Sequence, residues 1–182
     1  MKRGVRSYRG ANLLEFSAIF SVLVLFVLVP LVDLAAVPAR MAFANAAVRD
    51  AVLNLALSSK FSQAQSTLAA GSLLQARINS ISGASLVSNT LSIMATNSKG
   101  SSSFSSPGAI PSNWLPDGEG GPYRYNLVLS CVVDISPLFL VGSDSGVDVP
   151  GLTRPFRANI TESYAWENLS KNPETQQFYL NE

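Results

Sequence analysis

Residues 9–33, RGANLLEFSAIFSVLVLFVLVPLVD, form the most apolar stretch of the chain and decide its fold. Within residues 16–32 the only side chains that can form hydrogen bonds are Ser17 and Ser21. As a helix these 17 residues extend about 25 Å, which approaches the ~30 Å hydrocarbon core of a bilayer. The stretch therefore predicts a membrane-spanning helix. Its one early carboxylate, Glu15, requires an explanation, because an ionised acid is costly inside a bilayer.

The charge distribution predicts how this helix is oriented. The first ten residues hold four basic side chains and no acid; the four are Lys2, Arg3, Arg6 and Arg9. The formal charge of the chain is +1, and without these four the balance is nine basic against twelve acidic residues, or −3. The basic charge is thus a topology signal and not a nucleic-acid surface. We expect a cytoplasmic N-terminus, an extracytoplasmic C-terminal part and no nucleic-acid partner.

Cysteine and histidine usage argues against catalysis. Cys131 is the only cysteine, so the chain can form no internal disulfide and no cysteine-based metal site. Histidine is absent, which removes the commonest general base and transition-metal ligand. We therefore expect no enzyme activity, no catalytic residue, no metal and no cofactor. Cys131 itself is expected to be a buried apolar residue in a strand.

The helical pattern continues beyond the apolar run. Apolar residues recur there at steps of three and four, at Met41, Ala44, Val48, Val52 and Leu55. This predicts one helix from residue 11 to about residue 58, kinked near Pro30 or Pro38. More helix is expected over 60–79, interrupted at Gly71.

The second half of the chain predicts a small antiparallel sheet. Strands are expected over 86–95, 123–135 and 153–166. In the second of these, one face carries Tyr125, Leu127, Leu129, Cys131 and Val133, and the other face carries Val128 and Val132. The fold class is therefore α+β, a long N-terminal helix followed by a small sheet. The expected segments are a basic leader 1–10, a transmembrane helix 11–37, an amphipathic helical region 38–80, a sheet domain 81–170 containing a Ser/Gly/Pro-rich loop at 97–121, and a polar tail 171–182.

The start of the helix resembles a type IV prepilin processing site. The resemblance rests on Gly10, the sequence ANLLEF that follows it at 11–16, the basic stretch before it and the apolar helix after it. The Glu15–Phe16 pair, the run ending at Asp33 and the sequence NAAVRDAV at 45–52 are most similar to TadE-like minor pseudopilins of tight-adherence (Flp pilus) systems. The resemblance covers roughly residues 9–55. A small residue at Ala11, in place of Phe or Met, is typical of that branch.

This resemblance implies a function. A prepilin peptidase would cut after Gly10, making Ala11 the first residue and Glu15 the fifth of the mature chain. The new α-amino group, with a pKa near 8, would be cationic and could pair with Glu15 of a neighbouring subunit. The implied product is a pilin-like structural subunit of a bacterial inner membrane pilus or secretion apparatus. Its implied partners are the peptidase, other minor and major pilins, and the inner-membrane assembly platform.

Other interpretations remain open at this stage. The chain could be a single-pass, membrane-anchored extracytoplasmic binding module that no peptidase processes. A secretory signal peptide with an A-x-A site at 42–44 is disfavoured by the length of the apolar region. The acidic turns around Asp117 and Asp148 could hold calcium but fit capped turns better. Trp114, Trp166, Tyr123 and Tyr164 could form an exposed binding patch, although such aromatic residues more often pack in a core.

Overall fold

The computed structural model describes residues 8–71, 73–121, 123–139 and 148–182, with the backbone alone for 8–14. The chain divides into two compact units. The first, here called the membrane unit, comprises residues 1–39 and 136–156. The second, the sheet unit, comprises residues 40–135 and 157–182. Each unit is described by itself.

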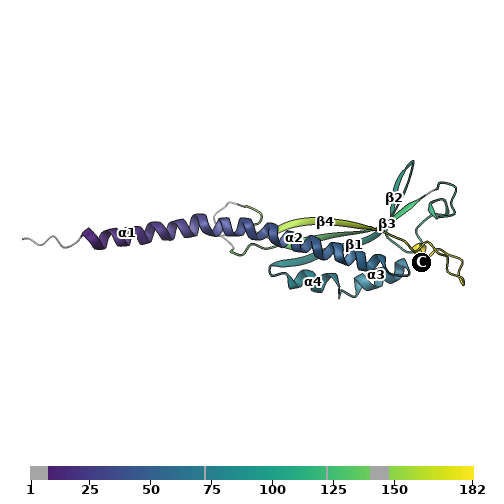
Figure 1. Ribbon diagram of the computed structural model, residues 1–182, viewed down its shortest axis with the longest axis horizontal. Coiled ribbons are helices and arrows are strands. Elements are labelled where there is room, and N and C mark those ends of the chain that lie inside the picture. The colour runs from purple at the N-terminus through teal and green to yellow at the C-terminus, as the bar shows by residue number, and fades with distance from the viewer. Residues whose placement is uncertain (1–7, 72, 122, 140–147) are drawn as a thin grey trace, which may run out of the picture. The chain divides into compact units, whose positions relative to one another are not determined.

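The N-terminal half is helical almost throughout (Figure 1). Helix α1 covers Tyr8–Leu23, a π-helical segment η1 covers Val24–Leu28, and α2 covers Val29–Ala56. The predicted helix over 11–58 is thus confirmed to within a few residues. Its irregularity lies directly before Pro30, whereas Pro38 lies inside α2.

The π-helical segment has a physical cause in Pro30. A proline inside a helix has no N–H to donate, and its ring clashes with the carbonyl four residues earlier. In this chain the Val29 N–H bonds back to the Val24 carbonyl, five residues earlier. This wider turn is the i→i+5 geometry that accommodates a disturbance without ending the helix. The apolar run therefore stays helical through its proline.

Two short helices follow α2 in the sheet unit. Helix α3 covers Phe61–Ala69 and α4 covers Leu74–Ser80. The break between them contains Gly71, which has a φ of +71°. Glycine adopts this left-handed conformation without a steric penalty, so the predicted interruption at Gly71 is confirmed. The region 38–80 is therefore three helical pieces and not one.

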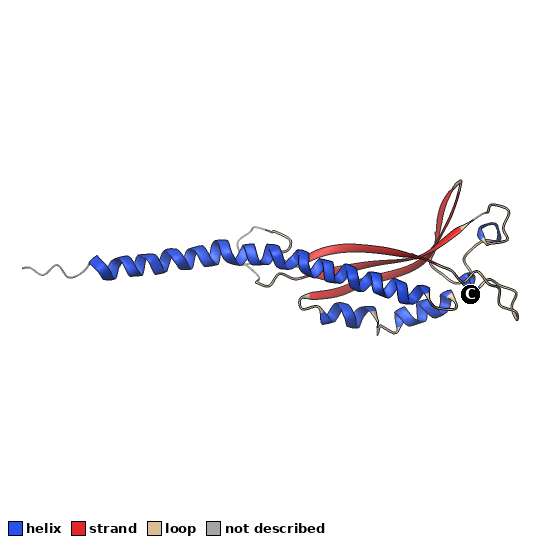
Figure 2. Ribbon diagram, viewed as in Figure 1, coloured by secondary structure: helices blue, strands red, loops and turns tan. Residues whose placement is uncertain are grey.

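The sheet has four strands in the order β2-β1-β3-β4. Their bounds are Ala84–Asn97 for β1, Gly100–Phe104 for β2, Arg124–Ile135 for β3 and Phe156–Ala165 for β4. Strand β1 pairs antiparallel with both β2 and β3. The α+β class is confirmed, with helices and strands forming separate layers in the sheet unit (Figure 2).

The core of the sheet unit lies between its helices and one face of the sheet. In the helices the fully buried residues include Ala44, Val48, Val52, Leu55, Phe61, Leu74 and Ile78. In the sheet they include Ile93, Tyr125, Leu127, Leu129, Cys131, Val133, Ala158 and Ile160. The predicted buried face of β3 is confirmed. Val128 and Val132, on its other face, are half-buried.

Two predictions for the second half were wrong. The expected loop over 97–121 contains strand β2, whose sequence GSSSF lacks the composition of a strand. The hairpin is specified instead by its turn, because the Asn97 side-chain oxygen accepts hydrogen bonds from Lys99 N and Gly100 N, both at 2.9 Å. A 3-10 turn, η2 at Ser112–Trp114, lies later in the same region.

The C-terminal residues 171–182 are polar in composition but are not a free tail. Phe178 and Leu180 are buried, and Asn172 is 8% exposed. Glu182 pairs with Lys60 at 2.6 Å, and Asn181 accepts a hydrogen bond from Ile110 N at 3.0 Å. Phe178 and Leu180 are too few to give a periodic pattern in the sequence. In the structure both are buried, and the 3-10 turn η4 at Tyr179–Asn181 lies beside them.

Candidate functional site

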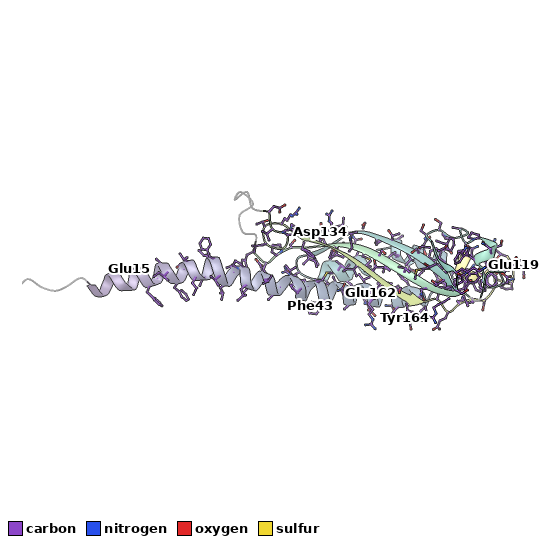
Figure 3. All side chains as sticks on the ribbon, turned by 90° about the horizontal axis from the view of Figure 1, so that it is seen from above. Glu15, Phe43, Glu119, Asp134, Glu162 and Tyr164 are labelled. Atoms are coloured by element: carbon purple, nitrogen blue, oxygen red, sulfur yellow. The ribbon has the colours of Figure 1, made fainter. Side chains whose placement is uncertain are left out.

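The candidate site is the exposed surface of the helix around Glu15. Glu15 and Phe16 lie in α1, and both side chains are exposed. Phe16 is 68% exposed and stacks on Phe20, with ring centroids 6.3 Å apart. Among the described residues no cation forms an ion pair with Glu15, whose place on the helix is labelled in Figure 3. The carboxylate thus stands on an apolar surface with its charge uncompensated by the described part of the chain.

The helix surface beyond Glu15 is apolar on all sides. Its large side chains between 40% and 74% exposed are Phe16, Ile19, Phe20, Val22, Leu23, Leu25, Phe26, Val27, Leu28, Leu31, Val32 and Leu34. Ser21 donates its hydroxyl to the Ser17 carbonyl at 2.8 Å, so this polar group is satisfied within the helix. Such a surface is unstable in water and suits a bilayer or a bundle of like helices.

The described residues contain one helix that is long and apolar enough to cross a membrane, Glu15–Ala56. Only 6% of its most apolar stretch is buried within the chain. The core helix of a soluble protein would be mostly buried. The described residues therefore include a single N-terminal helix that can span a bilayer.

Asp33 is a site residue whose role the sequence did not reveal. It ends the apolar run in the sequence, and in the structure its side chain is completely buried. One carboxylate oxygen, Oδ1, accepts hydrogen bonds from Leu138 N at 2.6 Å and Phe139 N at 3.2 Å. The other oxygen, Oδ2, has no hydrogen-bond partner among the described residues. Asp33 therefore fastens residues 138–139 to the helix inside the membrane unit.

Residues 149–152 form an apolar groove with the helix. A cavity of about 410 Å³ is lined on the helix side by Phe26, Val27, Pro30, Leu31 and Leu34 and on the other side by residues 149–152. The turn is held internally, since Val149 N donates to Thr153 Oγ1 at 2.9 Å and Arg154 pairs with Asp148 at 2.9 Å. Asp148 is thus engaged by an arginine. Asp144, another acidic residue of this loop, lies outside the described residues.

The predicted processing residues are placed only in part. Gly10 and Ala11 lie in the backbone of α1, which begins at Tyr8, and Arg9 lies in the same turn. Lys2, Arg3 and Arg6 lie outside the described residues. The structure thus places Glu15 and Phe16 as exposed neighbours on the helix. Cleavage at Gly10 and orientation by the basic residues stay predictions.

Several titratable groups of the sheet unit have shifted pKa values. Burial raises the pKa of the Cys131 thiol to about 11, and burial also raises the pKa of the Tyr125 hydroxyl, which donates to the Trp114 carbonyl. A hydrogen bond from Arg157 lowers the pKa of Asp134, and one from Lys171 lowers that of Asp117. Within the described ranges no three residues of the His, Cys, Asp and Glu types cluster as a metal site would require.

Comparison of the chain with protein-family models, with curated proteins and with solved structures gave no match. The function is therefore argued from the residues and geometry of this chain.

Proposed function

We propose that the chain is a minor pilin or pseudopilin of the TadE-like type, a structural subunit of a tight-adherence pilus or related secretion apparatus. In this proposal the helix inserts into the bacterial inner membrane with its N-terminus in the cytoplasm and its sheet unit outside. A prepilin peptidase then cuts between Gly10 and Ala11. The trimmed subunit joins other minor and major pilins at the inner-membrane assembly platform.

One observation carries the proposal: Glu15 is exposed on a membrane-length apolar helix, without an ion-pair partner among the described residues. An ionised carboxylate inside a membrane helix costs at least about 2.5 kcal/mol on insertion scales. Such a charge therefore needs a partner from outside the described chain. The α-amino group of a processed neighbouring subunit supplies the opposite charge at neutral pH.

The apolar surface supports the same interpretation. The exposed side chains around residues 16–32 need cover on every side. Lipid covers them in the precursor, and neighbouring helices would cover them in an assembly. Glu15 then sets the axial register of one helix against the next more than it adds stability, because buried ion pairs contribute specificity better than net free energy.

A matched set of variants in the native host tests the proposal. Glu15→Ala removes the charge, Glu15→Asp keeps it, and Ser17→Ala changes a neighbouring exposed residue of the same helix turn. We expect Glu15→Ala to abolish recovery of assembled pili in the sheared fraction while membrane insertion stays intact. Glu15→Asp should restore part of the assembly, and Ser17→Ala should assemble as the parent does.

The contrary result identifies the rival function. Normal assembly with Glu15→Ala, together with an uncut N-terminus, would mean that Glu15 has no pairing role. The chain would then be a single-pass, membrane-anchored extracytoplasmic binding module that acts through its sheet unit alone.

A further inference from the structure

One cavity in the sheet unit belongs to neither the helix nor the proposed assembly surface. It has a volume of about 570 Å³ and lies where the β1–β2 hairpin, the η2 turn and the start of β3 come together. That volume is within the range of roughly 300–1,000 Å³ typical of small-molecule sites. We propose that this cavity binds a neutral saccharide, as a free sugar or as the end of a glycan chain.

The walls of the cavity are tied together by hydrogen bonds. Tyr123 donates its hydroxyl to the Asn113 carbonyl, and Tyr125 donates its hydroxyl to the Trp114 carbonyl at 2.9 Å. Asn97 closes the hairpin turn with its oxygen and donates its amide N–H to the Gly120 carbonyl at 3.2 Å. All three walls are thus fixed before a ligand arrives. A preformed site loses little conformational entropy on binding.

Glycine is required where two of these walls meet. A Cβ atom added to Gly118 would lie 2.6 Å from the Ser112 carbonyl oxygen, and one added to Gly120 would collide with the Tyr123 hydroxyl. The backbone at 118–120 therefore approaches the η2 turn and Tyr123 more closely than any other residue type permits. Gly120 and Tyr123 both line the cavity.

The lining combines an aromatic surface with uncharged hydrogen-bonding groups. Trp114 and Tyr123 are half-buried, with ring centroids 5.4 Å apart, and Phe104 contacts Trp114 edge-on at 6.3 Å. The electron-rich face of such rings attracts the C–H groups on the apolar face of a pyranose ring. Asn113 and Ser101 also line the cavity, and each offers a donor and an acceptor. Sugar hydroxyl groups have the same dual character.

The charges of the lining favour an uncharged ligand. Lys99 and Glu119 contribute one positive and one negative charge, and neither forms an ion pair with another described residue. No arginine of the described residues lines the cavity, whereas phosphate and carboxylate ligands are commonly held by the planar fork of arginine. The lining thus selects neither anions nor cations, in agreement with a neutral saccharide.

The cavity lies at the end of the sheet unit that is far from the entry of the helix. The helix enters this unit at Arg40, whose guanidinium lies 2.8 Å from the position a Cβ on Gly83 would take, at the start of β1. Strand β1 then runs 14 residues to Asn97 at the cavity, or about 45 Å at 3.3 Å per residue. Figure 3 shows Glu119 and Phe43 at opposite ends of the sheet unit. Within the sheet unit, the cavity is therefore at the opposite end from Arg40.

Binding can be measured on the full chain in lipid nanodiscs, free of detergents with sugar headgroups. The neutral probes are the methyl pyranosides of glucose, galactose, mannose and N-acetylglucosamine and the matching linear trisaccharides. Methyl glucuronoside is the anionic probe for comparison. Saturation-transfer difference NMR and tryptophan fluorescence follow the titration; Trp166, the other tryptophan, is buried at 3% exposure. We expect saturable binding of at least one neutral probe with a Kd of about 1 mM or below. Tighter binding of a trisaccharide than of its glycoside identifies a glycan chain as the source.

Three variants connect the binding to the cavity. Trp114→Ala should weaken it by about tenfold or more, and Asn113→Ala, at an exposed position that the fold tolerates, by a few-fold. Phe43→Ala, an equally aromatic change at a residue 64% exposed near the start of β1, should leave it unchanged. The proposal is overturned if no neutral probe saturates the protein, if glucuronoside binds more tightly than glucoside, or if Asn113→Ala binds as the parent does. The inference does not depend on the subunit role, because it requires neither cleavage nor Glu15.

Discussion

Two stretches of the N-terminal helix are both rich in apolar side chains, but one stays exposed within the chain and the other packs into its core. Residues 16–32 are apolar all round and stay exposed within the chain, as Phe26 shows at 74% exposure. Residues 44–56 are apolar on one face only, and that face is the core, as Leu55 shows at 1% exposure. Polar residues such as Arg49 and Asn54 occupy the other face. Interrupted hydrophobicity marks a helix that packs in its own chain, and uninterrupted hydrophobicity marks one that needs lipid or other chains.

Cysteine labelling gives the largest contrast, between the apolar stretch and the turn that follows α2. Leu25→Cys and Leu57→Cys both place a thiol at an exposed position, since Leu25 is 61% and Leu57 is 80% exposed. In membranes, a water-soluble maleimide should label Leu57→Cys on the order of 100-fold faster, because a thiol in lipid neither ionises nor meets the reagent. The native Cys131, 2% exposed and with a pKa raised by burial to about 11, should stay unlabelled. Equal labelling at both positions would place residue 25 in water.

The packing of residues 44–56 into the core can be tested by truncating two leucines that lie two positions apart. Leu55→Ala should lower the free energy of unfolding of the sheet unit by about 2–5 kcal/mol, because it leaves a cavity in the core. Leu57→Ala should change it by less than about 0.5 kcal/mol, since that side chain is exposed. Urea unfolding of the full chain in detergent, followed by Trp166 fluorescence, measures both. Comparable losses would contradict the assignment of the buried face.

Substitutions of Asp33 test how residues 138–139 are held to the helix in the membrane unit. Asp33→Ala removes the acceptor of the Leu138 and Phe139 amides and should cost about 1–3 kcal/mol locally. Asp33→Asn keeps one carbonyl oxygen and serves as the matched variant. Hydrogen exchange should show both amides losing protection in Asp33→Ala and keeping most of it in Asp33→Asn. Fast exchange of these amides in the parent would remove the proposed fastening.

The smallest effect is expected at the C-terminal end, where a polar sequence is packed. Hydrogen bonds from Lys60 and then Thr175 lower the pKa of Glu182 below 4.5, and the bond with Glu182 raises that of Lys60 above 10.5. The pair therefore stabilises the fold between about pH 4.5 and 10.5. Its contribution is lost in acid as the pH falls through the folded-state pKa of Glu182.

Comparison of the parent with Glu182→Gln isolates this group. Denaturation midpoints at pH 7 and pH 3 should differ more in the parent than in the variant. The lowered pKa values of Asp117 and Asp134 act in both proteins and cancel in the comparison. An identical acid shift in parent and variant would show that Glu182 contributes no pH-dependent stability.

The sequence was most informative where one periodic pattern governed a long stretch. Residues 11–58 were predicted as helix because apolar spacing and length agreed, and the alternation of Tyr125 through Val133 predicted the buried face of β3. Strand β4 also alternates in sequence but buries only Ala158 and Ile160, since Phe156 and Tyr164 are 38% and 41% exposed. Strand ends depend on what packs there, which alternation does not encode.

The rest could not be predicted because it depends on contacts between distant residues. Strand β2 forms through a turn closed by Asn97 and through pairing with β1, although its own residues are serines. Asp33 bonds to backbone groups more than 100 positions away. The saccharide cavity joins residue 97 to residues near 113 and 120. The sequence named four aromatic residues as a candidate patch, and only Trp114 and Tyr123 of them line the cavity. Trp166 is buried and Tyr164 lies in β4.

We propose that Glu15 receives its partner from a cleavage after Gly10, and the mass of the mature chain is the measurement that tests this. The protein should be extracted from membranes of its native host and analysed intact, beside a Gly10→Val variant and a host lacking its prepilin peptidase. We predict a parent chain that begins at Ala11 and unprocessed chains in both controls. A parent chain that retains Met1, or one that begins at Asn45 after a signal-peptide cut, would contradict the account.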